Sequence, residues 1–293
     1  MPNLKAIRKR IASVKNTQKI TKAMKMVSSA KLRRAQQAMM QLRPYAAKNR
    51  ELLESLSQQL IDAGELDAHP LLTARENVKT VGFVVISSDR GMCGGFNSSI
   101  FRKLAETLRE RRAAGQAVVL FTIGRRIGIF GKKQSVQAHE DLLDVISAAV
   151  QARVKEITAR VVRAFLDGEV DEVIVLSNRF QSALTQVPTV YPLLPVAPPT
   201  GAGASVGSAD LIYEPGQAAL LSYVVPRFVE VQVRQSILES IAGEHAARMN
   251  AMSSATDNAN GMIQDLTLEM NRARQAAITK ELMEIIGGAE AMK

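Results

Sequence analysis

The chain has 293 residues, of which 46% are hydrophobic and 23% charged, so it can bury one or two packed cores and is not a disordered tail. No apolar run approaches the length of a membrane span, and the first residues contain no apolar signal-peptide core. A single cysteine, Cys93, excludes an internal disulfide framework and a Cys-based zinc cluster. His69, His139 and His245 are scattered without a metal-binding or triad motif.

The net charge of +10 comes from one end of the chain. Residues 1–50 contain 14 Lys and Arg and no Asp or Glu, whereas the other 243 residues carry 24 basic and 28 acidic side chains. The protein is therefore a mildly acidic chain with one very basic arm.

The basic arm has helical periodicity from Leu4 to about Leu60. Its apolar residues recur at three- and four-residue spacings, first at Leu4, Ile7, Ile11 and Val14. The same heptad then meets polar or charged residues at Gln18, Thr21, Lys25 and Ser28. We therefore expect the apolar stripe to slip to Ile20, Met24 and Val27 before it resumes at Leu32, Ala35, Met39 and Leu42.

The C-terminal region also predicts one long helix. Two series with a seven-residue spacing, offset by three and four residues, give a coiled-coil pattern: Met252, Ala259, Leu266, Ala273 and Met249, Thr256, Ile263, Met270, Ala277. We expect this helix to run from Phe228, after Pro226, to Ile286, with Gly287-Gly288 as its stop. Its length would match that of the basic arm, so the two are expected to pair antiparallel.

Strands alternate with helices in the middle of the chain. We expect strands at Val81–Ser87, Ala117–Ile123 and Glu172–Leu176 and an extended segment at Thr185–Pro195, with helices at Ser98–Ala114 and Glu140–Leu166. This order predicts an α/β domain with a largely parallel sheet. The domains expected are residues 1–62 and 216–293 as coiled-coil helices, 75–195 as the α/β domain and 196–215 as a linker.

The loop after the first strand holds Gly91, Gly94 and Gly95, where a phosphate could bind backbone N–H groups. Its spacing is not GxGxxG, and Gly131-Lys132 is followed by Lys133 instead of Ser or Thr. A tight turn that uses glycine at positive φ is favoured. Cys93 in this loop is interpreted as a packing residue. We find no catalytic constellation.

Four segments resemble the gamma subunit of F-type ATP synthases. They are residues 11–30 (IASVKNTQKITKAMKMVSSA), 88–97 (SDRGMCGGFN), 246–258 (AARMNAMSSATDN) and 278–291 (ITKELMEIIGGAEA). The resemblance covers essentially the whole chain. Because it starts within a few residues of Met1, it favours a bacterial protein without a transit peptide.

The resemblance implies a Rossmann-like central domain beside an antiparallel coiled coil, which acts as a rotor shaft. One copy would stand inside a ring of three alpha and three beta subunits, with the epsilon subunit and the membrane c-ring at its foot. The subunit would couple proton flow to ATP synthesis, without a cofactor, a metal or catalysis of its own. It would be a peripheral protein on the cytoplasmic face of the bacterial inner membrane.

The resemblance also assigns roles to individual residues. Coupling contacts would involve Met24, Lys25, Arg248, Gln275, Thr279 and Glu281. The foot on the c-ring would be residues 211–214, including Ile212, Tyr213 and Glu214. The tip from Ile278 would sit in an apolar collar. A lone Cys93 implies that the thiol switch of the plant chloroplast subunit is absent.

Three other functions remain open from the residues alone. The basic arm could bind nucleic acid, although aromatic residues are only 4% and the rest of the chain is acidic. The central domain could be a nucleotide-dependent enzyme with an oligomerising stalk. The basic helix could also anchor to a membrane surface.

Overall fold

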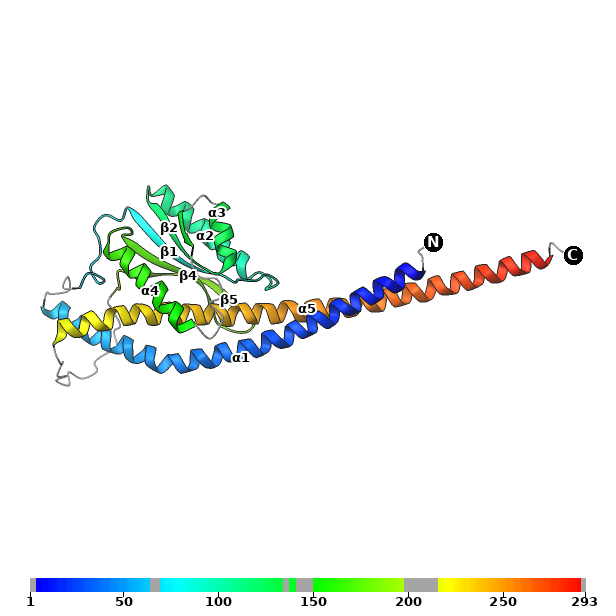
Figure 1. Ribbon diagram of the computed structural model, residues 1–293, viewed down its shortest axis with the longest axis horizontal. Helices are drawn as coiled ribbons and strands as arrows, with labels where there is room; N and C mark the ends of the chain where they lie inside the picture. The colour runs from blue at the N-terminus through cyan, green and yellow to red at the C-terminus, as the bar shows by residue number, and fades with distance from the viewer. Residues whose placement is uncertain (1–3, 64–68, 134–136, 141–149, 198–215, 291–293) are drawn as a thin grey trace. The chain divides into compact units, whose positions relative to one another are not determined.

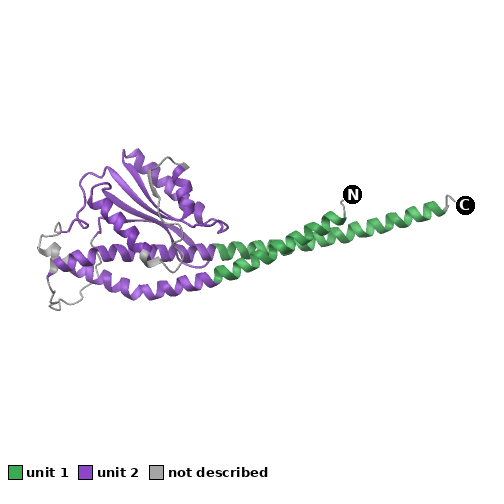
Figure 2. Ribbon diagram, in the orientation of Figure 1, with its two compact units in different colours: residues 1–29, 248–293 green, residues 30–247 purple. Residues whose placement is uncertain are grey.

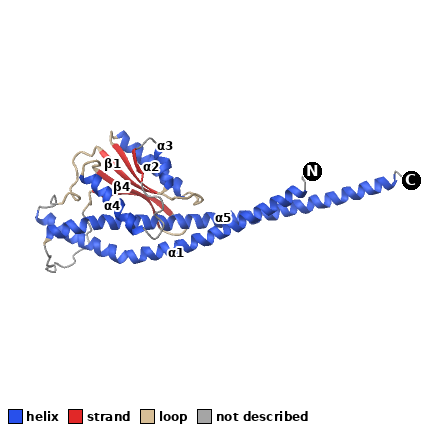
Figure 3. Ribbon diagram, viewed as in Figure 1, coloured by secondary structure: helices blue, strands red, loops and turns tan. Residues whose placement is uncertain are grey.

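The structure is a computed structural model that describes residues 4–63, 69–133, 137–140, 150–197 and 216–290. Figure 2 shows the two compact units of the chain, residues 1–29 with 248–293 and residues 30–247. The described residues of the first unit, here the two-helix unit, are all helical. The second, here the sheet unit, contains every strand that the structure describes (Figure 3).

The basic arm forms α1 (Leu4–Ala63), which confirms the helix predicted to about Leu60 and continues through Pro44. The C-terminal helix α5 (Gln217–Glu290) is longer than predicted at both ends, so the expectation of two matched helices is wrong: α1 has 60 residues and α5 has 74.

The two predicted limits of α5 fail for different physical reasons. Pro226 removes one backbone hydrogen bond, but Val224, Val225 and Val229 around it are fully or almost fully buried and hold this turn in the core. A helix-stopping glycine needs a positive φ, which neither Gly287 nor Gly288 adopts. The helix therefore continues through the glycine pair.

The sheet unit contains a five-stranded sheet with the order β3-β2-β1-β4-β5. Its strands are β1 (Thr80–Ile86), β2 (Ala117–Ile123), β3 (Gln137–Glu140), β4 (Glu172–Phe180) and β5 (Gln186–Leu194). The pairs β1–β2, β1–β4 and β2–β3 are parallel, and only β4–β5 is antiparallel. The largely parallel sheet is confirmed, and the proline-containing β5 lies at the edge, where a missing N–H is tolerated.

Helices cover both faces of this sheet (Figure 1). On one face lie α2 (Phe96–Ala113) and α3 (Arg125–Lys133), and on the other lie α4 (Val150–Leu166) and the part of α5 that belongs to this unit. Alternate residues of β1 serve the two cores: Val84 and Ile86 pack with α4 and α5, whereas Phe83 and Val85 pack with α2.

The prediction of one helix over Glu140–Leu166 is wrong at its N-terminal end. Gln137–Glu140 forms β3 and pairs with β2, and the described part of the helix begins at Val150. The helix α3 was also missed. The expected linker of residues 196–215 lies outside the described residues except for residues 196 and 197, and the expected foot with Ile212, Tyr213 and Glu214 lies wholly outside them.

Candidate functional site

Three contacts between α1 and α5 set the register of the two-helix unit. Gln18 Nε2 donates a hydrogen bond to Asn260 Oδ1. The hydroxyls of Thr21 and Thr256 are 2.8 Å apart, and Lys25 Nζ donates to Ser253 Oγ at 3.0 Å. As the residue number rises on α1 it falls on α5, so the pair is antiparallel, as predicted.

The seam between these helices contains polar residues of α1, although the sequence pattern predicts apolar residues there. Thr21 is 8% exposed and Ser28 is 3% exposed, whereas Ile20 and Val27 are 61% and 56% exposed. The predicted slip of the apolar stripe is therefore wrong. The heptad positions Gln18, Thr21 and Ser28 face the seam, and Gln18 and Thr21 find hydrogen-bonding partners on α5 at the same level. Between them, the half-buried Met24 lies closer to the seam than the exposed Lys25.

Ile20, Met24 and Val27 instead form an apolar row beside the seam, on the outer surface of α1. Their spacing of four and three residues puts them on one helical face, and Met24, nearest to the seam, is half-buried. Residues 4–29 contain eight Lys and Arg and no acid, so exposed lysines such as Lys19 and Lys22 border the row. This surface can bind a partner that offers both apolar and acidic groups.

Replacing both threonines of the seam by valine should not weaken the two-helix unit. Thr21→Val with Thr256→Val removes both partners of the hydrogen bond between the helices and adds apolar contact. It also removes the bonds from these hydroxyls to the carbonyls of Gln18 and Met252, which remain helix acceptors, so we expect a change between zero and a gain of about 1 kcal/mol. Hydrogen exchange of the amides of residues 4–29 should be unchanged or slower. The control is Thr267→Val, a half-buried threonine whose hydroxyl bonds only to the carbonyl of Ile263 at 2.6 Å. Faster exchange in the double variant alone would contradict the expectation.

The end of α5 is a helix without a partner helix among the described residues. It continues beyond Leu4, the first residue of α1 (Figure 1). Its exposed apolar side chains are Ile278, Leu282, Met283, Ile285 and Ile286, with exposed fractions from 50% to 68%. The Lys280–Glu284 ion pair at 3.5 Å is exposed and adds little. A cluster of large, exposed apolar side chains of this kind is typical of a surface that contacts another protein.

The residues assigned to coupling form two groups on this unit. Met24 and Lys25 lie on the paired part of α1, and Arg248 is 8% exposed near the start of the paired part of α5. Gln275, Thr279 and Glu281 are exposed on the unpartnered end. Along α5, Arg248 and Gln275 are separated by roughly 40 Å at 1.5 Å per residue. The structure therefore does not bring the two groups together.

The loop after β1 is a network that joins two helix N-termini. Asp89 Oδ1 accepts a hydrogen bond from the first amide of α3, Arg125 N, at 3.0 Å. Asn97 of α2 accepts one from Ser88 N at 3.1 Å and donates one to Cys93 Sγ at 3.3 Å. Cys93 is 2% exposed, which confirms its interpretation as a packing residue.

The predicted tight turn in this loop is present. Gly94 has φ 55°, but the second left-handed position is taken by Met92 (φ 59°). Gly95 has φ −81° and precedes α2 without a side-chain cap. Positive φ is thus needed at only one of the three glycines of the loop.

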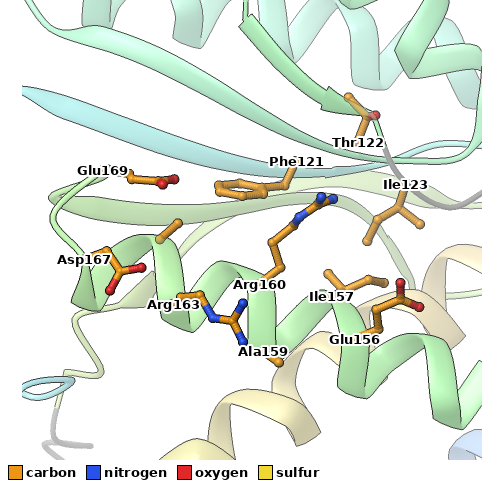
Figure 4. A pocket seen from close by; sticks show the side chains of 11 residues that line it. Phe121, Thr122, Ile123, Glu156, Ile157, Ala159, Arg160, Arg163, Asp167 and Glu169 are labelled. Carbon is orange, nitrogen blue, oxygen red and sulfur yellow. The ribbon is translucent and has the colours of Figure 1, made fainter.

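A cavity of about 430 Å³ lies between β2 and α4 (Figure 4). Arg160 extends from α4 toward Phe121, while Glu156, Asp167 and Glu169 place carboxylates around the rim. Charges of both signs line this space, so it does not select a ligand of one charge.

Other titratable groups of the sheet unit serve the fold. Burial lowers the pKa of His69, whose Nδ1 accepts a hydrogen bond from Leu71 N at 3.2 Å.

Within the described residues, no three His, Cys, Asp or Glu side chains are placed to hold a metal ion. In that same part of the chain, no helix combines the length and the apolar character needed to cross a bilayer.

Two long helices paired antiparallel, together with a largely parallel α/β sheet, are the architecture of the stalk subunit of a rotary ATP synthase, and comparison with known proteins agrees. The ATP synthase family model matches residues 3–292. The ATP synthase gamma chains of Geobacter sp. (strain M21) and Anaeromyxobacter sp. (strain Fw109-5) are each 47% identical to this chain over its full length and theirs. The chain belongs to the ATP synthase gamma-chain family.

Solved structures share the fold. A chain in the cryo-EM structure of the Euglena gracilis mitochondrial ATP synthase, OSCP/F1/c-ring in rotational state 3, has a TM-score of 0.63 at 19% identity, covering 99% of this chain and 94% of that one. A chain in the central stalk/c-ring structure of the Tetrahymena thermophila mitochondrial ATP synthase has a TM-score of 0.59 at 23% identity, covering 80% of this chain and 99% of that one.

Proposed function

We propose that this chain is the central rotor shaft of an F-type ATP synthase. It would couple proton flow through the membrane c-ring to ATP synthesis at sites held by alpha and beta subunits, and would not be catalytic by itself. The observation that carries the proposal is the end of α5, where a helix without a partner among the described residues has large apolar side chains that are 50% to 68% exposed. Such a helix is suited to turning inside an apolar collar formed by other subunits.

The partners proposed are three alpha and three beta subunits around one copy of this chain, with an epsilon subunit and a c-ring at the foot. The alpha and beta subunits would contact Met24, Lys25, Arg248, Gln275, Thr279 and Glu281. The c-ring would contact residues 211–214. We propose that the chain divides functionally into two coiled-coil helices (residues 1–62 and 216–293), an α/β domain (75–195) and a linker with the foot (196–215). The proposed location is the cytoplasmic face of a bacterial inner membrane.

The basic surface of α1 fits this role because exposed ion pairs are weak. Each is worth about 0–1 kcal/mol, so acidic loops of the surrounding subunits could exchange such contacts as the shaft turns. Ile20, Met24 and Val27 would add apolar contact at the same level of the shaft.

Native mass spectrometry of the tagged chain, purified gently from its own cell, tests the assembly. We expect one copy with three alpha and three beta subunits. A homo-oligomer without these partners, or a complex with nucleic acid, would refute the proposal.

Met24→Lys tests the coupling surface. It puts a charge into the apolar row beside Lys25, and we expect the protons pumped per ATP hydrolysed to fall roughly two- to tenfold, which corresponds to up to about 1.4 kcal/mol at the affected step. ATP hydrolysis and proton pumping are measured together in membrane vesicles. The control is Met26→Lys, because Met26 is 61% exposed and lies outside the row. Unchanged pumping and hydrolysis in Met24→Lys would remove Met24 from the coupling surface.

A further inference from the structure

The sheet unit has a second cavity, which shares no lining residue with the cavity between β2 and α4. It has a volume of about 380 Å³ and lies between α1, the end of β4 and α5. Its lining residues, here called the arginine groove, are Met39, Leu42, Arg43, Ala46, Ala47, Arg50, Arg179, Phe180, Gln232, Gln235 and Glu239.

Three guanidinium groups and one carboxylate line the arginine groove, so its lining carries an excess of positive charge. Arg43 and Arg50 come from one face of α1, and Arg179 comes from β4. All three are exposed, and among the described residues none of them forms a hydrogen bond or an ion pair. Glu239 is the one acid in the described lining, and its carboxylate already accepts a hydrogen bond from Gln235 Nε2 at 2.9 Å.

The rest of the groove is apolar or able to donate hydrogen bonds. Leu42 is 6% exposed and Phe180 is half-buried, so the groove has a packed wall beneath its charged rim. Gln232 is half-buried and supplies a further amide. A concave space with apolar walls and a few convergent polar groups is the usual form of a small-ligand site.

We propose that the arginine groove binds a small anion that carries two or more phosphate groups. A guanidinium presents paired N–H donors that match phosphate oxygens, and three such groups can balance the charge of a diphosphate or triphosphate. The volume of about 380 Å³ falls in the range of roughly 300–1,000 Å³ that is usual for small-molecule sites. Phe180 and Met39, which are both half-buried, offer contact area to a nucleoside attached to the phosphates. This binding site goes beyond the rotor function and does not depend on it.

Isothermal titration of the full chain with pyrophosphate, and separately with magnesium-free ATP, tests the proposal at fixed ionic strength. We expect one saturable site for pyrophosphate. Arg43→Gln combined with Arg179→Gln should weaken binding by about tenfold or more, because two charge-assisted contacts are lost. The control is Arg34→Gln, which removes one positive charge from the opposite face of α1. It should change the affinity by less than about twofold.

Comparing the two ligands distinguishes a site that binds phosphate groups alone from a site that also contacts a nucleoside. Tighter binding of ATP than of pyrophosphate would show that the groove also contacts a nucleoside, and equal binding would show that it reads phosphate alone. Absence of saturable binding to either ligand overturns the proposal. Equal weakening by Arg34→Gln also overturns it, because binding would then reflect overall charge. Matching circular dichroism spectra and thermal midpoints show that the variants are folded.

Discussion

Gly124→Ala should unfold the sheet unit or destabilise it by roughly 3–5 kcal/mol, as expected for strain at a left-handed position combined with a backbone clash. Gly124 joins β2 to α3 with φ +98°, and a Cβ there would lie 2.3 Å from the carbonyl oxygen of Ser87. Ser87 cannot move away easily. Its N–H donates to the carbonyl of Ile123 at 2.8 Å, and its hydroxyl accepts from Ile127 N at 3.0 Å.

Tyrosine fluorescence during urea unfolding measures this effect on the sheet unit alone, because the four tyrosines of the chain all lie between residues 30 and 247. The control is Gly128→Ala within α3, where a Cβ would meet nothing within 4 Å. It should stabilise the protein by up to about 1 kcal/mol through helix propensity. An unchanged urea midpoint for Gly124→Ala would contradict the proposed clash.

Asp171→Asn should cost about 2–4 kcal/mol at neutral pH, because it replaces a largely buried, fully hydrogen-bonded carboxylate. Asp171 Oδ1 accepts from Arg75 Nη1 at 2.7 Å, and Oδ2 accepts from Lys79 N at 2.8 Å and Thr80 N at 2.9 Å. The same Arg75 donates to the carbonyl of Phe165 at 2.5 Å and stacks over its ring. An asparagine has one acceptor oxygen, so its N–H₂ must face either Arg75 or the backbone N–H groups of Lys79 and Thr80, which are all donors. The control is Asp167→Asn, which changes an exposed carboxylate nearby.

The pH dependence of this loss has a defined sign. Burial acts to raise the pKa of Asp171, but hydrogen bonds from Thr80, Arg75 and Lys79 outweigh it and hold the pKa below the ordinary value of 3.8. The stabilisation is therefore fully present above the unfolded pKa and is lost as the pH falls through the lower folded pKa. The difference in unfolding free energy between wild type and Asp171→Asn should shrink as the pH falls below about 4. A difference that stays constant into this acid range would contradict the assignment.

Local pattern was sufficient to predict most of the architecture and insufficient for two short elements. Strong apolar runs predicted β1 and β2, and the long uninterrupted periodicity predicted α1 and most of α5. The helix α3 contains Gly128 and Gly131, which lower helix propensity, and its N-terminus is fixed by Asp89 from a distant loop. The strand β3 has the sequence QAHE, with no β-branched residue, and its conformation comes from pairing with β2.

The polar seam shows why the register of α1 was misread. Considered alone, Gln18, Thr21 and Ser28 are poor choices for a buried stripe, and Ile20 and Val27 are better ones. The choice reverses once α5 is aligned, because Asn260 and Thr256 satisfy the polar groups. Polar residues at heptad positions on both helices were the one feature of the sequence that indicated a hydrogen-bonded seam. Similarly, the arginine groove joins residues of α1 and β4 that only the tertiary fold brings together.

The composition of the two-helix unit has a consequence for biosynthesis. Its two segments, residues 1–29 and 248–293, are more than 200 residues apart in sequence, so residues 18–25 of α1 cannot pair until residues 253–260 of α5 have been translated. At about 5–20 residues per second, the N-terminal segment waits on the order of ten seconds or more for its partner. During that interval its eight positive charges repel one another, and its polar seam residues reduce the apolar surface offered to other nascent chains. A seam built from hydrogen-bonding groups therefore suits a segment that is synthesised long before its partner, and the same groups fix the alignment once the partner arrives.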